Sequence, residues 1–569
     1  MNSILQDKSY IFAISIVKLA QFLQKDQKEF VISNQILKSG TSTGALIREA
    51  EFAQSQADYI NKFYISLKEA NETNYWLNLL KDTGYIDGNN FTSMEKDNKK
   101  ITSRDVDFAK WYTDVVKAAH LADYSSVKGC IVIEPNGYAI WEKMQSILDQ
   151  EFKKLGHVNC QMPLLIPENM LNKEKDLVEG FAPEVAWVTE GGSKKLDEKL
   201  CIRPTSETLF CDYYHNHVKS HRDLPMLYNQ WCNVFRWEKE TRPFLRSREF
   251  LWQEGHTVHA TKEEAEKETD QMMGVYHDFH NNVLAIPSIR GKKTEKEKFS
   301  GAEYTLTNEA LMYNGVSLQA GTSHYFGQKF SKAYDVKFTN KENKEEYVYQ
   351  TSWGTTTRMI GALIMVHSDD YGLVLPPRIA PKQVVIIPIG KSEEVKKIAE
   401  EYKEKLLNNG VVAYIDDTEK SPGFKFAEAE VNGIPVRIEI GERDLAQNKI
   451  VVTRRDTREK MDVAKNIDIV KYTKDLLEII QHDMYERAKE RRDKLTFEAH
   501  NLDEMKQILE TQPGFIHAMW CGNPKCEEKI KEIRGCKSRC ILENKALIDD
   551  RCVCCGSEAK YYVVWGIQY

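Results

Sequence analysis

Residues 233–254 read NVFRWEKETRPFLRSREFLWQE, and this stretch decides the fold of the central part of the chain. Strand character in residues 233–238 resumes in residues 249–258, and the polar sequence KETRPFLRS lies between them. This pattern predicts a β-hairpin with a basic loop. Because side chains alternate between the two faces of a strand, we expect Arg236 and Glu238 to point the same way.

The residue types of this hairpin suit a nucleotide. A planar guanidinium beside a carboxylate, as in Arg236 and Glu238, matches a ligand that has both a phosphate and amine donors. An aromatic ring on the same face, such as Phe250, stacks on a base. ATP has all three features. The alternative interpretation is cross-strand ion pairing on an exposed hairpin.

Length and composition indicate a globular protein of several domains. With 569 residues the chain is too long for one core, so three or four domains are expected. Its apolar runs are too short to span a bilayer, and its first residues lack the pattern of a signal peptide. We therefore expect a cytoplasmic protein without membrane contact. The formal net charge of −6 does not indicate a nucleic-acid partner. Binding of a nucleic acid would need a local basic face.

Composition and periodicity divide the chain into five segments. The first has apolar residues at helical spacing, interrupted by glycines at 40–44, and predicts a small antiparallel helical bundle. The second is a polar linker that contains Met94, an alternative start. The third mixes strands and helices, the fourth alternates them as a compact α/β domain does, and the fifth holds most of the cysteines. These segments are residues 1–87, 88–100, 101–380, 381–485 and 486–569.

Three further stretches carry candidate binding residues. In CIRPTSETLF (201–210), the oxygens of Thr205 and Glu207 suit a cationic amine, although a Thr–Glu helix cap is the alternative. Arg358 begins an apolar helix, where a cation opposes the macrodipole, so we expect an anionic ligand nearby. The stretch SLQAGTSHYFGQ (317–328) adds Gln319, Thr322 and His324.

Together these stretches resemble the class II aminoacyl-tRNA synthetases. FRWE…RSREFLWQE is similar to the second signature of that class, and GTTTRMIGAL is similar to the third. A helix expected at 138–155, which runs into QMP with Pro163, is similar to the first. The series RPTSE, FRWE…WQEGHT, QAGTSHYFGQ and TSWGTTTR resembles the prolyl-tRNA synthetases over about residues 101–569. The resemblance implies an α+β multidomain fold whose catalytic domain is an antiparallel sheet rather than a Rossmann fold.

The same resemblance implies a role for each candidate residue. Arg236 is expected to contact the α-phosphate of ATP and the carboxylate of proline, and Arg358 the γ-phosphate, which makes these two the catalytic residues. The implied ATP-binding residues are Arg236, Glu238, Phe250, Gln319, Thr322, Thr356 and Arg358. The implied proline-binding residues are Thr205, Glu207, Arg236 and His324.

The implied enzyme is a proline–tRNA ligase. It activates proline with ATP to prolyl-adenylate and pyrophosphate, aided by Mg²⁺, and then transfers proline to the 3′ end of tRNA(Pro). A homodimer through the catalytic domain is also implied. Arg236 and Arg358 lie 122 positions apart (358 − 236), which leaves no room for the large editing domain of one branch of the family, so the archaeal and eukaryotic-like branch is expected. The alternatives are a sister enzyme for threonine or glycine, and a regulatory or tRNA-binding relative without catalysis.

Two C-terminal features complete the resemblance. Residues 421–444, SPGFKFAEAEVNGIPVRIEIGERD, are similar to the anticodon-binding domain of the family, in which Glu430, Arg443 and Asp444 are expected to read anticodon bases. The alternative there is a solvated hairpin. Related enzymes end in a tyrosine that packs back towards the catalytic domain, and Tyr569 is expected to do the same.

The cysteines of the last segment predict a structural zinc site. Of the twelve cysteines, seven lie between residues 521 and 555. Two close pairs in a cytosolic chain are typical of a tetrahedral thiolate site, and free thiols are the alternative. The family likeness selects Cys521, Cys526, Cys552 and Cys555 as ligands, with Cys554 as a possible substitute.

The N-terminal segment has its own resemblance. About residues 10–82 are similar to the four-helix-bundle proteins encoded in intervening sequences of 23S ribosomal RNA genes. This likeness admits three interpretations: a natural fusion, an oligomerising or RNA-contacting appendage that brings the ligase to ribosomes, and a misassigned start. We expect its apolar stripes to form a core, and no site residue is assigned there.

Overall fold

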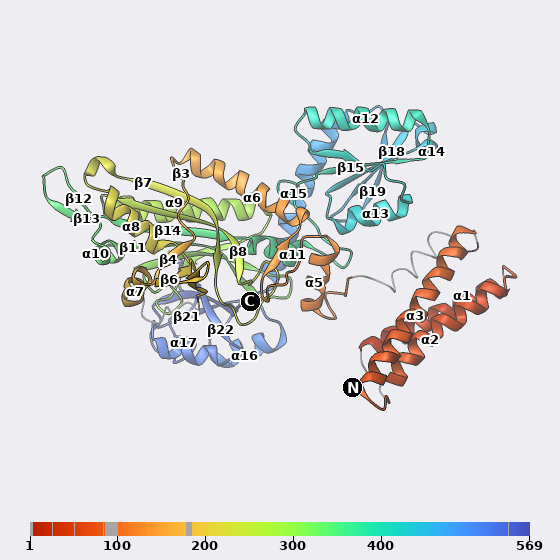
Figure 1. Cartoon of the computed structure of the whole chain (residues 1–569), viewed down its shortest axis with the longest axis horizontal. Helices are drawn as coiled ribbons and strands as arrows, with labels where there is room; N and C mark the ends of the chain where they lie inside the picture. Colours follow the sequence, from red (N-terminus) through yellow and green to blue (C-terminus); the bar gives the residue numbers. More distant parts are fainter. Residues whose placement is uncertain are drawn as a thin grey trace. The chain divides into compact units, whose positions relative to one another are not determined.

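The computed structural model describes residues 4–25, 27–50, 52–83, 85, 101–177, 185–543 and 545–569. The chain forms two compact units, Met1–Lys100 and Ile101–Tyr569 (Figure 1). The predicted linker at 88–100, with Met94, lies outside the described residues. Among the described helices, none is both long enough and apolar enough to cross a bilayer.

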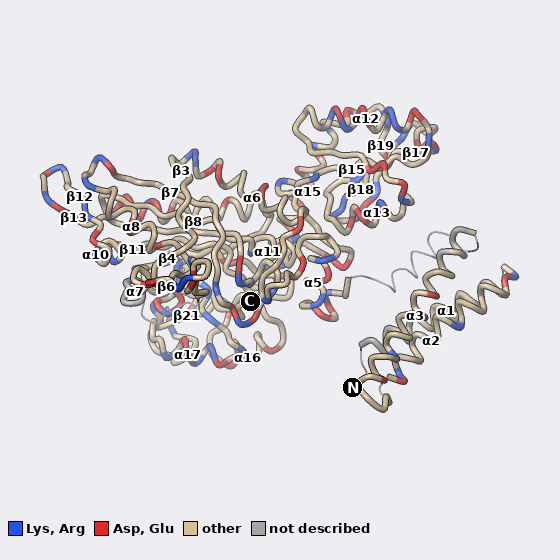
Figure 2. Tube along the Cα trace, in the orientation of Figure 1, with Lys and Arg blue, Asp and Glu red and all other residues tan. Residues whose placement is uncertain are grey.

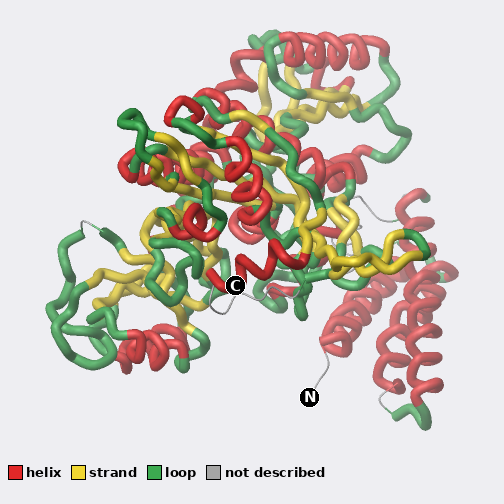
Figure 3. Tube along the Cα trace, turned by 60° about the vertical axis from the view of Figure 1, so that its left-hand side comes forward, coloured by secondary structure: helices red, strands yellow, loops and turns green. Residues whose placement is uncertain are grey.

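The described secondary-structure elements of the first unit are all helices (Figure 3). This described part contains α1 (Ile4–Lys25), α2 (Val31–Ala50) and α3 (Gln56–Asp82), and the expectation of a four-helix bundle stays a prediction. The glycines at 40–44 do not interrupt α2. A side chain at Gly40 would lie 2.8 Å from Ile16, so the glycine lets α1 and α2 pack closely. Ile16, Leu19 and Leu23 of α1 are buried in the small core of this unit.

The centre of the second unit is one eleven-stranded sheet. Its neighbouring strands pair antiparallel except at β20–β21 and β3–β7, which confirms the predicted antiparallel architecture. In spatial order the strands are β20 (Thr496–Glu498), β21 (Phe515–Trp520), β23 (Tyr561–Ile567), β22 (Cys536–Ile541), β9 (Ile289–Lys292), β10 (Tyr304–Leu311), β11 (Ser317–Gly327), β14 (Tyr349–Thr356), β8 (Glu249–His259), β7 (Met226–Phe235) and β3 (Val158–Asn159).

The hairpin predicted from residues 233–254 is β7–β8, in register from Phe235 opposite Glu249 to Met226 opposite Val258. The strand ends at Phe235, so Arg236 and Glu238 lie in the connection and not on the strand. A bond from the Glu238 amide to the Arg236 carbonyl, 2.8 Å long, turns the chain at this point. Their side chains are therefore aimed by the turn rather than by strand alternation.

Helix α9 covers one face of the sheet. α9 packs against β8, β10, β11 and β14, and the Tyr276 hydroxyl reaches Gln253 on β8. The predicted helix at 138–155 is α6, which begins three residues earlier and ends before Gly156, whose φ is +91°. The helices here are α5 (Phe108–Ala118), α6 (Pro135–Lys154), α7 (Glu168–Leu177), α8 (Glu207–His217), α9 (Lys262–Asp278), α10 (Lys329–Ala333) and α11 (Arg358–His367), with short turns η2 (His221–Asp223) and η3 (Phe279–Val283).

Three small sheets flank the large one. They are β1–β2, the three-stranded β4–β6–β5, and the hairpin β12–β13. Their strands are β1 (Ala122–Tyr124), β2 (Ile131–Ile133), β4 (Leu165–Pro167), β5 (Trp187–Gly191), β6 (Lys194–Ile202), β12 (Lys337–Thr339) and β13 (Glu345–Tyr347).

Residues from Val384 form the expected α/β domain, a five-stranded sheet in the order β16–β15–β17–β18–β19. Its first three strands in this order are parallel and the rest antiparallel. Acidic and basic residues alternate along the outer helix α12 (Figure 2). The elements are β15 (Val384–Ile389), α12 (Glu393–Asn408), β16 (Ala413–Ile415), α13 (Pro422–Val431), β17 (Val436–Gly441), α14 (Glu442–Ala446), β18 (Lys449–Arg454), β19 (Lys460–Ala464) and α15 (Ile469–Lys494).

The C-terminal segment is joined to the catalytic sheet. Ile541 of β22 pairs with Lys292 of β9, so β20–β23 extend the large sheet rather than forming a sheet of their own. Two helices accompany these strands, α16 (Leu502–Thr511) and α17 (Pro524–Lys531). The single helix α15 leads into this segment and runs through residues 485 and 486, where a domain boundary was predicted.

Candidate functional site

A cavity of about 310 Å³ lies on the face of the sheet opposite α9. Strand alternation builds much of its floor: Phe250, Trp252, Glu254 and His256, every second residue of β8, all line it. The structure brings together in this one cavity all ten residues that the sequence predicts for ATP and proline. These are Thr205, Glu207, Arg236, Glu238, Phe250, Gln319, Thr322, His324, Thr356 and Arg358.

Three guanidinium groups converge in the cavity. Burial, together with the charges of Arg236 and Arg246, lowers the pKa of Arg358 to about 10. Arg358 is held by the Leu245 carbonyl, 3.3 Å from its Nε. Clustering like charges is unfavourable, and an anion with several negative charges would offset the repulsion. The arrangement therefore fits a polyphosphate.

Arg236 is aimed by its neighbours. Its Nε donates to the Pro204 carbonyl at 3.0 Å, and its guanidinium lies over the rings of Trp252 and Phe250, 5.0 and 5.6 Å from their centroids. Glu238 lies 4.0 Å from Arg246 across the same loop. A cation, an aromatic face and a carboxylate are thus presented side by side, as the sequence predicts for a nucleotide.

A buried carboxylate also lines the cavity. Glu207, 6% exposed, is the first residue of α8. It accepts hydrogen bonds from the hydroxyl of Thr205 and, at 3.4 Å, from that of Ser352. A carboxylate in a buried pocket can pair with a substrate ammonium. The predicted pairing of Thr205 with Glu207 is a direct contact.

Beneath this carboxylate lies a buried network that the sequence did not reveal. Glu254 accepts from Gln230 at 2.6 Å, from Ser206, and from His256 at 3.1 Å. Burial alone would raise the pKa of Glu254, but hydrogen bonds from His256, Ser206 and Gln230 outweigh it and lower the pKa. Ser206 stands between Thr205 and Glu207, so this ionised carboxylate fixes their backbone. The alternation along β8 was the signal that could have indicated His256.

His324 is neutral. Burial, and the charge of nearby His256, lower its pKa to about 3. The Phe299 amide donates to Thr305 Oγ1 at 3.2 Å, and that hydroxyl lies 2.8 Å from His324 Nδ1. The Thr305 hydroxyl therefore links the Phe299 backbone to the His324 ring. His324 thus offers the pocket a neutral ring.

Tyr569 reaches the loop between β7 and β8. Its phenol accepts a hydrogen bond from Arg242, whose guanidinium lies 5.4 Å from the centre of the ring. Its amide donates to the Ser317 carbonyl at 3.0 Å, which ties it to the start of β11.

The predicted anticodon residues are not brought together. Glu430 precedes β17, whereas Arg443 and Asp444 follow that strand in α14. A strand of six residues spans about 17 Å. Glu430 instead accepts from Arg437 at 3.3 Å, and Arg437 also donates to Glu439 at 3.0 Å. The sequence missed Arg437, because an arginine inside a strand looks like surface charge although this one is only 4% exposed.

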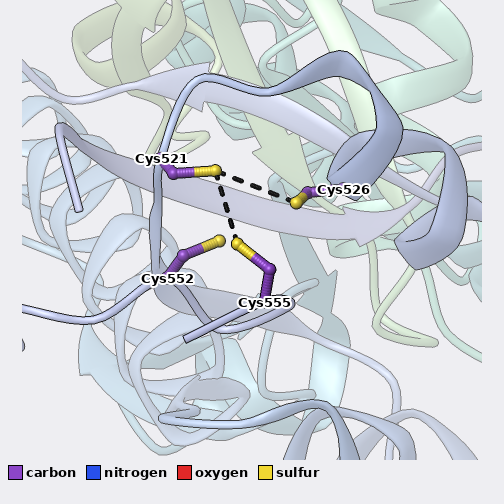
Figure 4. Close-up of side chains that lie close together, drawn as sticks. All are labelled: Cys521, Cys526, Cys552 and Cys555. Atoms are coloured by element: carbon purple, nitrogen blue, oxygen red, sulfur yellow. Dashed lines mark hydrogen bonds between the residues drawn. The ribbon is translucent and has the colours of Figure 1, made fainter. Parts of the chain in front are cut away.

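The cysteines predicted for zinc form one cluster (Figure 4). The four Sγ atoms of Cys521, Cys526, Cys552 and Cys555 lie within 4.8 Å of one another. Cys521 Sγ is 3.8 Å from that of Cys526 and 3.7 Å from that of Cys555. Tetrahedral Zn–S bonds of about 2.3 Å place sulfurs about 3.8 Å apart, so the cluster fits zinc. Cys554 does not belong to the group.

Sequence families match consecutive parts of the chain. Residues 1–104 match the 23S rRNA-intervening sequence protein family, and residues 187–367 the class II tRNA synthetase core domain for G, H, P, S and T. Residues 383–473 match the anticodon binding domain, and residues 502–569 the prolyl-tRNA synthetase C-terminal domain.

Curated relatives and a solved structure agree with these matches. The chain is 58% identical over 472 residues to a proline–tRNA ligase of Lachnoclostridium phytofermentans, covering 83% of this chain and 98% of that protein. It is 57% identical to one of Clostridium novyi, covering 82% and 98%. A crystal structure of prolyl-tRNA synthetase from Cryptosporidium parvum, complexed with halofuginone and AMPPNP, is 39% identical, with a TM-score of 0.79 and coverage of 83% and 99%.

Proposed function

This chain belongs to the prolyl-tRNA synthetases, which join proline to tRNA at the expense of ATP, and we propose that the cavity over β8, β11 and β14 is its active site. One observation carries the proposal. The ten residues expected from separate stretches of sequence converge in this cavity, which combines guanidinium groups with the buried carboxylate of Glu207.

ATP binds along the arginine side. Arg236 contacts the α-phosphate and Arg358 the γ-phosphate, so that the triphosphate offsets the repulsion between the guanidinium groups. Phe250 stacks on the adenine, and Glu238 accepts from its amine. Gln319, Thr322 and Thr356, on β11 and β14, complete the nucleotide site. In support, Arg236 is positioned by the Pro204 carbonyl and Arg358 by that of Leu245.

Proline binds at the Glu207 side. Its secondary ammonium pairs with Glu207 and donates to Thr205, and its carboxylate reaches Arg236. The neutral ring of His324, with its low pKa, forms the wall of the pocket. A protonated His324 would repel the ammonium, so burial of this histidine favours a cationic substrate.

Activation needs no protein nucleophile. A proline carboxylate oxygen attacks the α-phosphorus, the bond from that phosphorus to the bridging oxygen breaks, and pyrophosphate leaves with the electron pair. The terminal ribose hydroxyl of tRNA(Pro) then attacks the carbonyl carbon of prolyl-adenylate, and AMP leaves. Arg236 and Arg358 act by alignment and by neutralising charge that develops on the phosphates.

Magnesium binds proteins through one or two carboxylates together with substrate phosphates. Glu297, partly exposed at the cavity, has suitable donor atoms. The ion would supply further charge neutralisation on the triphosphate. Zinc would be held by Cys521, Cys526, Cys552 and Cys555 as a structural ion, because four protein thiolates leave no open coordination position.

The other domains follow from the same assignment. We assign residues 101–380 to catalysis, 381–485 to anticodon binding and 486–569 to the zinc domain, with α15 shared by the last two. In the second of these, Glu430, Arg443 and Asp444 remain the proposed contacts for bases of tRNA(Pro). The enzyme acts as a cytoplasmic homodimer through its catalytic domain.

Residues 1–87 are an appendage to the ligase, and residues 1–104 match the 23S rRNA-intervening sequence protein family. We propose contact with ribosomes or RNA. The full chain is expected to sediment with ribosomes, and binding that survives deletion of residues 1–93 would remove the basis of this proposal.

Amino-acid-dependent ATP–pyrophosphate exchange tests the active site. The full chain is assayed with proline, alanine, cysteine and threonine, and exchange is expected to be fastest with proline. Fastest exchange with threonine would indicate a sister enzyme. Exchange with none of the four, from folded protein with its zinc, would indicate a regulatory protein without catalysis.

A further inference from the structure

The loop between β9 and β10, residues 293–303, lines the cavity with Lys293, Glu297, Lys298 and Phe299. We propose that the C-terminal domain positions this loop, and through it the proline pocket, with Glu527, Ser538 and Arg539 as positioning residues. The inference rests on the proposed function of the cavity. Two sets of buried contacts carry it, and a third, more exposed set accompanies them.

The first set is a buried hydroxyl–carboxylate cluster. Thr294 Oγ1 donates to Glu527 Oε1 at 2.9 Å, and the Ser538 hydroxyl donates to the same oxygen. The two hydroxyls are 3.1 Å apart. All three side chains are buried, with Thr294 and Ser538 each 1% exposed and Glu527 4% exposed. A buried carboxylate that loses its donors is costly, so this cluster fixes the start of the loop against α17.

The second set is a buried ion triad. Glu309 of β10 accepts from Lys293 at 2.7 Å through one oxygen. Its other oxygen accepts from Arg539 of β22, at 3.0 Å from Nε and 2.7 Å from a terminal nitrogen. The side chains of Glu309 and Arg539 are fully buried. The C-terminal domain thereby supplies one of the two cations that balance a carboxylate beneath the loop.

The third set is more exposed. Lys537 of β22 lies 3.2 Å from Glu297, and Lys296 lies 3.1 Å from Glu528 of α17. Such pairs contribute little to stability on their own. They show that the loop also contacts the C-terminal domain at partly exposed positions.

The far end of the loop reaches the proline side of the cavity. The Phe299 amide donates to Thr305, whose hydroxyl contacts His324. The Phe299 ring also lies 5.2 Å from the His324 ring. A shift of the loop would therefore change the wall around proline. The arginines expected to hold ATP are anchored elsewhere, on the carbonyls of Pro204 and Leu245.

This difference in anchoring makes the proposal testable. The variant Glu527→Gln keeps the shape of the side chain but removes its charge. We expect the KM for proline in ATP–pyrophosphate exchange to rise about tenfold, while the KM for ATP changes less than about twofold. Hydrogen exchange of residues 294–302 is expected to become faster.

Glu528→Gln is the matched control, since it makes the same change at the next residue of α17, where the carboxylate is exposed. This control is expected to behave as wild type, and zinc content equal to that of wild type shows that both variants keep the metal site. Thr294→Val removes the hydroxyl of the loop that donates to Glu527. This variant is expected to raise the KM for proline as Glu527→Gln does.

Three results would overturn the inference: an unchanged KM for proline in both Glu527→Gln and Thr294→Val, equal rises for proline and ATP, or the same effect in Glu528→Gln. A wild-type chain without proline-dependent exchange would instead refute the proposed function itself.

Discussion

Arg242, in the connection between β7 and β8, donates a hydrogen bond to the phenol of Tyr569. The same connection carries Arg246, and it carries Leu245, whose carbonyl holds Arg358. Tyr569, which follows β23, therefore stabilises the connection between β7 and β8. We call this contact the brace, because the connection holds the arginines expected to bind the triphosphate. This contact agrees with the expectation that Tyr569 packs back on the catalytic domain.

Removing the Tyr569 hydroxyl tests this brace. Tyr569→Phe keeps the ring but loses a hydrogen bond to a charged group, which contributes about 1.5–3 kcal/mol. We expect kcat/KM for ATP in pyrophosphate exchange to fall about tenfold. Tyr561→Phe, at an exposed tyrosine of β23, is the control and should have little effect. Equal activity of both variants would contradict the brace.

Substitution of Glu207 should separate the two substrates. Glu207→Gln keeps the shape but removes the charge expected to pair with the proline ammonium in a buried site. The KM for proline should rise about a hundredfold, with the KM for ATP nearly unchanged. Glu238→Gln is the counterpart and should mainly raise the KM for ATP. If both variants raised the two constants alike, the assignment of the two residues to different substrates would be wrong.

Metal analysis should distinguish the clustered cysteines from their neighbour. We expect about one zinc per chain in wild type and in Cys554→Ser, but little in Cys526→Ser, because three thiolates hold zinc less tightly than four. Elemental mass spectrometry of purified protein measures this. If Cys526→Ser retained zinc and Cys554→Ser lost it, Cys554 rather than Cys526 would be the zinc ligand.

Acid should destabilise the folded chain through buried histidines. Burial lowers the pKa of His280 to about 3 from its usual 6.5, so between these values the unfolded chain binds a proton that the folded chain excludes. Stability is therefore lost as the pH falls from 6.5 towards 3, with a slope of up to about 1.4 kcal/mol per pH unit from this group. His259 and His367 are expected to contribute in the same way as His280, because burial lowers their pKa values to about 4 and about 3.

His280→Leu should weaken this dependence. Urea unfolding midpoints of wild type and variant are compared at pH 7 and pH 5, and the variant should lose less between them. His482→Leu, at an exposed histidine of α15, should show the wild-type dependence. A larger acid sensitivity in His280→Leu than in wild type would contradict the buried neutral state of His280.

Local patterns in the sequence were sufficient to predict the residues that line the cavity. Arg236, Phe250 and Arg358 sit in short stretches whose order and spacing identify a class of fold, and that fold brings them together. The zinc cysteines were predictable for the same reason, since close pairs with metal-ligand spacing are a local signal.

Contacts between distant segments could not be predicted in this way. Glu309 and Arg539 are 230 positions apart, and nothing near either residue indicates the other. The extent of β7, which stops at Phe235, depends on a turn set by backbone hydrogen bonds. Helix propensity alone made Gly40 look like a helix breaker. Propensity takes no account of Ile16, which packs so closely against Gly40 that only a small residue fits there.

The pairing of β22 with β9 bears on how such a gene can change. A chain cut before β20 would leave β9 as an open sheet edge, prone to pair with other chains, and Glu309 without Arg539. Recombination that exchanged this domain would have to preserve the strand pairing and the buried triad together. The described strands of the large sheet include none from residues 1–100, a compact unit of their own, so exchange of that unit would leave the pairing intact.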